Sequence, residues 1–163
     1  MKAVSVGIIG SGFASHFHSR AFDRVAGVAV RKRAIADIDI QKAQAVATLH
    51  NFEEYHEDYR VLLKDPQIDV IDICTPPFLH AKITLEAIAA GKHVLCEKPL
   101  TGYFGAPGDV PPIGDTVPKS RMYQGVTDEI ATLRDALAGS DRLFMYAENY
   151  DYSPNIMKTD EIN

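Results

Sequence analysis

The stretch "AVSVGIIGSGFASHFH", residues 3–18, decides the fold. Its first half is rich in β-branched residues and ends in glycine, which predicts a strand over 3–10. Helical periodicity begins directly afterwards and predicts a helix over 14–27. Gly10 and Gly12 lie between the two elements, so the stretch is expected to fold as a strand, a tight glycine turn and a helix.

The turn has the pattern G-x-G-x-x-small, written here as Gly10-Ser11-Gly12-Phe13-Ala14-Ser15. Gly10 allows the tight turn, and Gly12 lets a pyrophosphate group approach the backbone. Amide groups at the start of the helix then face the negative charge of the phosphates. Ser15 stands where Gly or Ala is usual, so the packing of helix on strand has to accommodate a hydroxyl group.

An acidic residue stands where a dinucleotide would need one. Asp37 follows the second predicted strand and can accept hydrogen bonds from both hydroxyls of the adenosine ribose, while it would repel a 2′-phosphate. Asp39 is the rival position if that strand ends two residues later. The pattern therefore predicts NAD as cofactor and disfavours NADP. A methyltransferase that uses S-adenosylmethionine is the alternative class, but it usually has an acid before the turn, where this chain has Ile8 and Ile9.

Further strand-like and helical segments alternate along the chain, which predicts parallel strands connected by helices. Six strands of this kind fit a doubly wound α/β (Rossmann) sheet in the order 3-2-1-4-5-6. A long loop rich in Gly and Pro, 101–126, interrupts the alternation, and Tyr103, Phe104 and Tyr123 in it could line a substrate entrance. After the first helix, strands are expected within 28–39, near Tyr55, and over 68–74, 93–98 and 142–149, and helices over 40–50, 57–65, 80–91 and 127–140, the last capped by Thr127.

Composition limits the class of protein. The chain has 163 residues, of which 46% are hydrophobic, the size of one globular domain, and its formal net charge of −5 is not that of a nucleic-acid binder. Its apolar runs are shorter than the about 20 residues that span a bilayer, so a cytoplasmic protein without a membrane partner is expected. Cys74 and Cys96 each lie in an apolar run and are expected to be reduced core thiols, with no metal site.

The block "IDVIDICTPPFLHAKITLEAIAAGKHVLCEKPL", residues 68–100, carries three motifs in order: T-P-x-x-x-H over 75–80, G-K-H over 91–93 and E-K-P over 97–99. In order and spacing they resemble the N-terminal domain of the Gfo/Idh/MocA family of NAD(P)-dependent oxidoreductases. His18 in the first helix also matches the family. The similarity extends over roughly residues 3–100, with a weaker match at 146–154.

The resemblance implies a role for each candidate residue. It assigns the pyrophosphate to Gly10, Gly12, Phe13 and Ala14, the adenosine ribose to Asp37, and contact with the cofactor to Thr75, Pro76 and His80. His80 opens a helix, and capping or packing there is favoured over catalysis.

Glu97 and Lys98 would approach the nicotinamide ribose and the substrate. Lys98 is the candidate catalytic residue, because an amine that is partly desolvated at a strand end can exchange a proton with an alcohol. The opposing interpretation is that Lys98 only forms an ion pair with Glu97 or faces solvent.

Family members carry a second α/β domain, which supplies a catalytic histidine and usually the oligomer interface. The expected organisation is a dinucleotide-binding domain over 1–152, with 153–163 beginning the linker helix to a missing substrate domain. The chain is therefore expected to be a fragment, a truncated product or a short relative, which acts on a sugar, inositol or polyol only in the full-length context. Homo-oligomers are compatible with this organisation. A standalone dinucleotide-binding module and a non-catalytic remnant remain as alternatives, and Asp151 is given no role.

Overall fold

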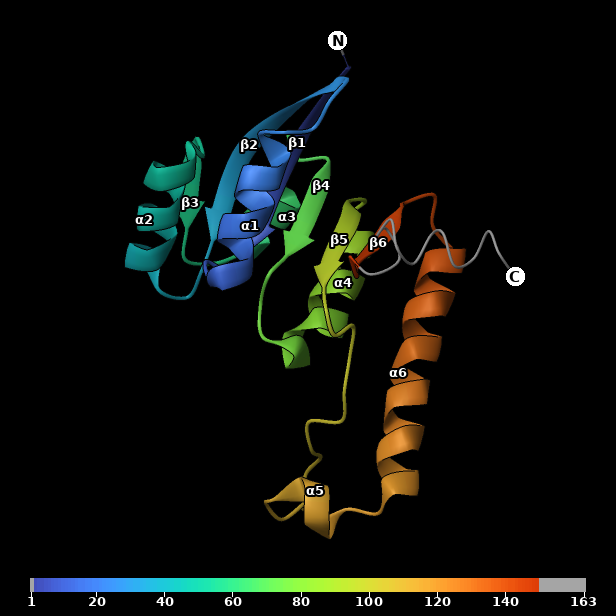
Figure 1. Cartoon of the computed structure of the whole chain (residues 1–163). Coiled ribbons are helices and arrows are strands. Elements are labelled where there is room, and N and C mark those ends of the chain that lie inside the picture. The colour runs from blue at the N-terminus through green and yellow to red at the C-terminus, as the bar shows by residue number, and fades with distance from the viewer. Residues whose placement is uncertain (1, 150–163) are drawn as a thin grey trace, which may run out of the picture.

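The computed structural model describes residues 2–149, and they form one parallel six-stranded sheet with helices between its strands (Figure 1). The strand order is β3-β2-β1-β4-β5-β6, which confirms the predicted doubly wound topology. The strands are β1 (Lys2–Ile9), β2 (Val28–Ala36), β3 (Glu54–His56), β4 (Val70–Ile73), β5 (His93–Glu97) and β6 (Phe144–Ala147). The helices are α1 (Phe13–Phe22), α2 (Ile40–His50), α3 (Arg60–Lys64), the short 3-10 helix η1 (Pro77–Leu79), α4 (His80–Ala89), α5 (Ile113–Thr116) and α6 (Lys119–Ala138).

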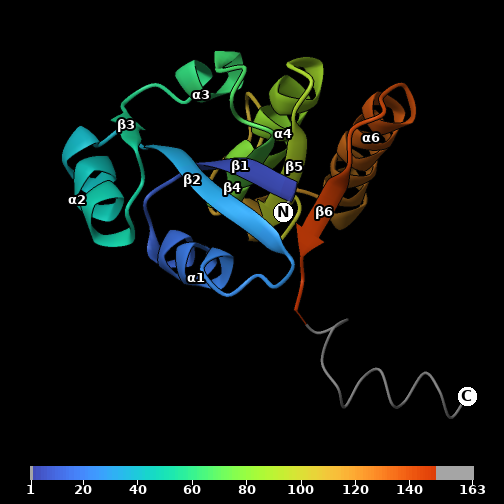
Figure 2. The same cartoon turned by 90° about the horizontal axis from the view of Figure 1, so that it is seen from above.

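Two hydrophobic cores lie on opposite faces of the sheet. Side chains alternate along each strand, so Ile8 belongs to the core beneath α1 and α2, and Ile9 to the core beneath α3, α4 and α6. Figure 2 shows α1 on one face of the sheet and α3, α4 and α6 on the other. In α2 the residues Ala43, Val46 and Ala47, which share one face of the helix, are all buried.

The chain reverses its direction of winding at β1, which pairs with β2 on one side and β4 on the other. Helices leave toward opposite faces at this point, and in doubly wound sheets the crevice that binds a ligand lies beyond the carboxyl ends of the two strands concerned, which here are β1 and β4. The glycine turn after β1 and the Thr75-Pro76 pair after β4 both lie at this edge. The topology alone therefore places the sequence motifs together.

The first helix is shorter than the predicted 14–27, and its buried face consists of small side chains. It ends at Phe22, and Phe17 is 53% exposed, whereas Ser15 and Ser19 are fully buried. The Ser15 hydroxyl donates to the Gly12 carbonyl at 2.6 Å, and the Ser19 hydroxyl donates to the Ser15 carbonyl at 2.6 Å. The hydroxyl groups of these two buried serines are satisfied by carbonyl groups of the helix and its N-cap.

The last helix begins eight residues earlier than predicted, at Lys119 and not at Thr127. Thr127 does not cap it: this side chain lies mid-helix and donates to the carbonyls of Tyr123 and Gln124. The sequence predicts Gly125 within the loop 101–126, but it lies inside α6. A Cβ at this glycine would lie 3.0 Å from a ring carbon of Tyr103, so the glycine serves close packing of the helix against the preceding loop.

The loop that leads from β5 to α6 therefore spans 98–118 and contains α5. It extends beyond the carboxyl edge of the sheet, together with the first half of α6 (Figure 1). Asp109 organises it: its carboxylate accepts from the Tyr103 hydroxyl at 2.6 Å and from the Ala106 amide at 2.7 Å, and pairs with Arg121 of α6 at 2.9 Å. These contacts hold the loop against the helix.

None of the helices in the described part of the chain is long and apolar enough to cross a membrane. The other predicted elements occur within a few residues of their expected bounds. The expected linker at 153–163 and Asp151 lie outside the described residues.

The G-K-H motif lies at the opposite end of the sheet from the glycine turn. Gly91 ends the helix before β5 with a positive φ of 74°, as predicted. Lys92 is buried, and its ammonium group donates to the carbonyls of Asp65 at 2.6 Å and Ile68 at 2.8 Å. Burial lowers the pKa of this lysine.

The last residue of the motif connects two strands. His93 Nδ1 accepts from the Leu143 amide at 3.0 Å, which ties β5 to β6. The motif thus connects elements and is remote from the crevice.

Replacing Lys92 with Met is expected to lower the free energy of unfolding by about 2 kcal/mol, because two charge-assisted hydrogen bonds to buried carbonyls are lost. Urea denaturation measures this change. Lys64→Met, at an exposed position of α3, is the matched control and should stay within about 0.5 kcal/mol of wild type. Equal stability of the two variants would contradict this role of Lys92.

Candidate dinucleotide-binding site

The glycine turn is fixed by its contact with the end of β4. Gly10 has a φ of 99°, and a Cβ on it would lie 2.5 Å from the Cys74 carbonyl oxygen. Its amide donates to the Ala36 carbonyl at 2.8 Å, so the turn is also tied to the end of β2. Both the backbone conformation and the available space require glycine at this position.

The second glycine faces open space. A Cβ on Gly12 would meet no atom within 4 Å, and this residue precedes α1 without any side-chain cap on the helix. The first amides of a helix need acceptors, and phosphate oxygens are suitable ones. Phe13 is 80% exposed beside this space, while Ala14 packs against the core under α1. An open, uncapped helix start fits a pyrophosphate group.

Asp37 lies directly against the turn. One of its carboxylate oxygens accepts from the Ser11 amide at 2.8 Å and from the Ser11 hydroxyl at 2.7 Å. The other accepts from the Asp39 amide at 2.9 Å. Burial alone would raise the pKa of Asp37, but the hydrogen bonds from Asp39 and Ser11 outweigh it, and the pKa lies below its ordinary value. Asp37 is therefore ionised at neutral pH.

The rival acid, Asp39, has a different task. Its side chain caps α2 by accepting from the amides of Gln41 and Lys42. Between the two acids, Ile38 is 90% exposed. Of the two acids, Asp37 is the one that bonds to the glycine turn.

Beyond β4, Thr75 and Pro76 begin the connection to α4. The Thr75 hydroxyl oxygen is buried without a hydrogen-bond partner among the described residues. His80 is fully buried at the start of α4, and its ring nitrogens lie 2.8 Å from the carbonyl oxygens of Thr75 and Pro99. The His80 side chain therefore joins the connections that follow β4 and β5 from behind the crevice.

Glu97 ends β5, and Lys98 follows it. One carboxylate oxygen of Glu97 accepts from the Lys98 amide at 2.8 Å. The Lys98 side chain is exposed, and within residues 2–149 its ammonium group has no ion-pair partner. The expected partial desolvation is not present in the protein alone: Lys98 faces solvent, as one form of the opposing interpretation has it, and forms no ion pair with Glu97.

Glu97 is also part of a cluster of largely buried side chains. His18 of α1 contacts Asp72 of β4 at 2.8 Å through Nδ1 and Glu97 at 3.1 Å through Nε2. The Cys74 thiol lies 3.8 Å from Nδ1, and the potential ligand atoms of His18, Asp72 and Cys74 all lie within 4.8 Å of one another. Burial raises the pKa of the Cys74 thiol well above its ordinary value, so this cysteine is protonated. The separation of 2.8 Å between His18 Nδ1 and the Asp72 carboxylate is that of a hydrogen bond.

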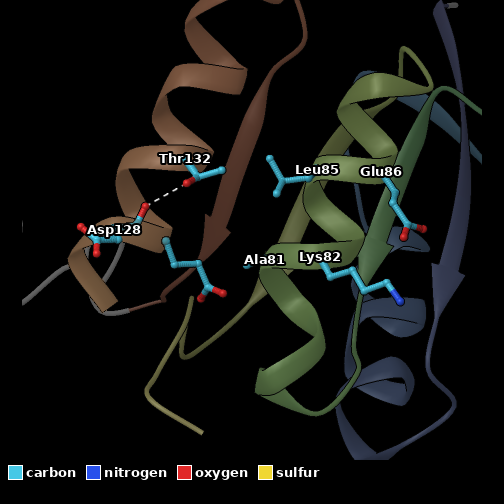
Figure 3. Close-up of a pocket in the computed structure, with 7 residues that line it drawn as sticks. Ala81, Lys82, Leu85, Glu86, Asp128 and Thr132 are labelled. Atoms are coloured by element: carbon cyan, nitrogen blue, oxygen red, sulfur yellow. Dashed lines mark hydrogen bonds between the residues drawn. The ribbon is translucent and has the colours of Figure 1, made fainter. Parts of the chain in front are cut away.

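The most evident pocket lies elsewhere. It is an open hollow of about 540 Å³ between α4 and α6, lined by Ala81, Lys82, Leu85, Glu86, Asp128, Glu129 and Thr132 (Figure 3). Leu85 points from α4 toward Thr132, whereas Lys82 and Glu86 point away from α6. None of its lining residues belongs to the turn or to the ends of the strands. This hollow is a gap between two helices, and the candidate site is the crevice.

The sequence pattern pointed to candidate residues that follow strands, but not to the residues that form hydrogen bonds with them. Ser11 was only a variable letter within the G-x-G pattern, yet it makes two hydrogen bonds to Asp37. Asp72 was overlooked inside an apolar strand. An acid between two isoleucines was the signal that could have marked it, because a buried carboxylate needs a partner.

A parallel doubly wound sheet, a glycine turn before an uncapped helix and an acid bonded across that turn together define a dinucleotide-binding domain. A family model described as "Oxidoreductase family, NAD-binding Rossmann fold" matches residues 4–106. The chain belongs to this family, the Gfo/Idh/MocA oxidoreductases, and the match confirms the predicted resemblance and the prediction of NAD as cofactor.

Curated relatives include levoglucosan dehydrogenase of Pseudarthrobacter phenanthrenivorans, 40% identical over 107 residues, which is 61% of this chain and 27% of the relative. Inositol 2-dehydrogenase of Paracoccus denitrificans is 35% identical over 98 residues, covering 60% of this chain and 29% of the relative. A solved structure of levoglucosan dehydrogenase in complex with NADH and L-sorbose superposes with a TM-score of 0.76 at 29% identity. It covers 96% of this chain and 37% of that one.

The chain thus spans less than a third of the length of the two curated relatives and 37% of the solved one. Sugar and polyol dehydrogenases are what it resembles. The matched part is the nucleotide-binding part, so the substrates of these relatives are not carried over by the match.

The two glycines of the turn should respond differently to substitution by alanine. Gly10→Ala is expected to lower the free energy of unfolding by about 1–3 kcal/mol or more, because its Cβ meets the Cys74 carbonyl and its φ is unfavourable. Gly12→Ala should leave thermal stability close to wild type and weaken NAD binding at least about tenfold, because the methyl group enters the ligand's space. Thermal denaturation and calorimetric titration measure the two effects. Unchanged NAD affinity in Gly12→Ala would place the pyrophosphate elsewhere.

Proposed function

We propose that this chain is the cofactor-binding half of an oxidoreductase that transfers hydride between NAD and a sugar, inositol or related polyol. The observation that carries the proposal is the arrangement at the carboxyl edge of the sheet: an open helix start at Gly12, Asp37 across the turn, and Lys98 exposed at the end of β5. The sugar and polyol dehydrogenases among the relatives support the substrate class.

Each residue in the crevice would have one task. Gly12 and the first amides of α1, from Phe13 and Ala14, would hold the pyrophosphate, and Asp37 would accept hydrogen bonds from the adenosine ribose. The unpartnered hydroxyl of Thr75, next to Pro76, would meet the cofactor beyond β4. Glu97 would accept from the nicotinamide ribose.

NAD supplies the hydride acceptor when it is bound. The substrate hydroxyl must lose a proton as its carbon loses hydride. Lys98 would stabilise the developing oxyanion as an ammonium group, or, as a neutral amine, accept that proton and pass it to solvent. Its ammonium is exposed, so the water exclusion that strengthens such an interaction must come from cofactor, substrate or further protein. We therefore expect the chain of 163 residues to bind cofactor and turn over little.

Cofactor preference tests Asp37. In calorimetric titrations NAD is expected to bind at least about tenfold more tightly than NADP, because the Asp37 carboxylate repels a 2′-phosphate. Asp37→Ser should reduce or reverse this ratio. Asp39→Asn removes the same charge two residues away and keeps a side chain able to cap α2, so it should preserve the ratio. A wild-type preference for NADP would contradict the role given to Asp37.

Turnover tests the assignment to the cofactor half. With NAD and myo-inositol, glucose or another polyol, NADH formation followed at its absorbance band should stay near the rate without protein. Any residual rate should disappear in Lys98→Met, which keeps the aliphatic stem but removes the proton-carrying group. Robust oxidation by the chain alone would contradict the expected low activity. Binding of NAD without oxidation of any polyol, even in a longer protein, would favour a binding-only module, and failure to bind dinucleotide would favour a remnant.

A further inference from the structure

We propose that His18 is a positioning residue: anchored on Asp72, it holds the carboxylate of Glu97 and, through it, the backbone of Lys98 at the nicotinamide end of the site. This inference rests on the proposed function. It adds a residue from α1 to a site otherwise built from the ends of strands.

Side-chain contacts of His18 connect α1 to both β4 and β5. His18 Nδ1 lies 2.8 Å and 3.0 Å from the two carboxylate oxygens of Asp72 on β4. His18 Nε2 lies 3.1 Å from one oxygen of Glu97 at the end of β5. The other Glu97 oxygen accepts from the Lys98 amide at 2.8 Å. The residue proposed to meet substrate therefore leaves the sheet from a backbone position that His18 helps to fix.

The position of Asp72 indicates that it anchors His18. Alternation along β4 puts Ile71 and Ile73 in the core under α4, so Asp72 points to the opposite face, toward α1. Its side chain is fully buried, and a buried carboxylate is costly unless it is paired. His18 supplies that pairing. With both nitrogens engaged, the ring has little freedom to rotate.

Both partners of His18 accept hydrogen bonds, so the ring donates to both only when it is protonated. The groups that face it are Asp72 and Cys74 from β4 and Glu97 from β5. Burial alone would lower the pKa of His18, but the hydrogen bonds and charges of Asp72 and Glu97 outweigh burial and raise it. Burial also raises the pKa of Asp72. The complete clamp is therefore present when His18 is charged.

Two amide substitutions separate anchoring from positioning. The side-chain nitrogen of Asn can replace Nδ1, so His18→Asn keeps a donor to Asp72 and loses the one to Glu97. The side-chain nitrogen of Gln can replace Nε2, so His18→Gln keeps a donor to Glu97 and leaves Asp72 unpaired. His16→Asn, on the same helix, is the matched control, because His16 contacts His50 of α2 and not this cluster.

The test compares NAD with ADP-ribose, which lacks nicotinamide, by calorimetric titration of the purified chain in buffer with EDTA. His18→Asn is expected to bind NAD at least about tenfold more weakly while its ADP-ribose affinity stays within about twofold of wild type. His18→Gln should recover most of the lost NAD affinity but melt at a lower temperature. A purely structural role predicts instead that neither variant is weakened selectively for NAD relative to ADP-ribose, and that result would overturn the inference.

A double-mutant cycle with Glu97→Gln is a second test, and the pH profile of wild type described below keeps the proposal testable if the His18 variants do not fold. Glu97→Gln should lose NAD affinity selectively, as His18→Asn does. Adding His18→Asn to Glu97→Gln should then change NAD affinity little further, because both act through one contact. Additive losses would show that His18 acts independently of Glu97 and would overturn the inference. If wild type binds neither NAD nor ADP-ribose, the proposed function fails and the inference with it.

The pH profile is a second readout. The folded pKa of His18 is raised above its ordinary value of 6.5, so while Asp72 is ionised the contribution of His18 should be complete below that value and disappear as pH rises through the raised pKa. The affinity ratio of NAD to ADP-ribose should fall over this range in wild type and stay flat in His18→Asn. A flat ratio in wild type, or the same fall in His18→Asn, would contradict the role of the protonated ring.

Discussion

The Cys74 carbonyl oxygen lies where a side chain at position 10 would have to begin, and most of the site depends on this close approach. Because Gly10 has no Cβ, the turn after β1 can rest on the end of β4, and the Cys74 amide in return donates to the Ile9 carbonyl at 2.8 Å. The contact fixes where α1 begins. It thereby sets the open space at Gly12, the position of Ser11 opposite Asp37, and the approach of α1 to the sheet that brings His18 to Asp72.

Local patterns determined the sheet, and for a physical reason. Parallel strands are buried on both faces, so they appear as short apolar runs, and the crossover helices between them set the order. The same logic located the candidate site, since residues that follow parallel strands must meet at one edge. Gly10 and Asp37 could be proposed from the strand pattern alone, whereas Thr75 and Lys98 were proposed from the resemblance to the family.

The errors arose where a residue type served an unusual purpose. Gly125 and Thr127 resemble a break and a cap, yet both lie inside α6, because a glycine lets Tyr103 pack against the helix. In α1 the buried positions are taken by Ser15 and Ser19, whose hydroxyl groups bond within the helix, while Phe17 is half exposed. Long-range partners such as Ser11–Asp37 and His18–Asp72 join residues from different elements, and no local pattern encodes them.

His80 has a consequence of its own for movement at the crevice. Its buried ring spans two backbone carbonyls, one on the segment after β4 and one at the base of the long loop after β5. Because the ring contacts both carbonyls, the two segments cannot shift independently without losing a hydrogen bond in the interior. The segments that follow β4 and β5 are therefore coupled to each other through one buried side chain.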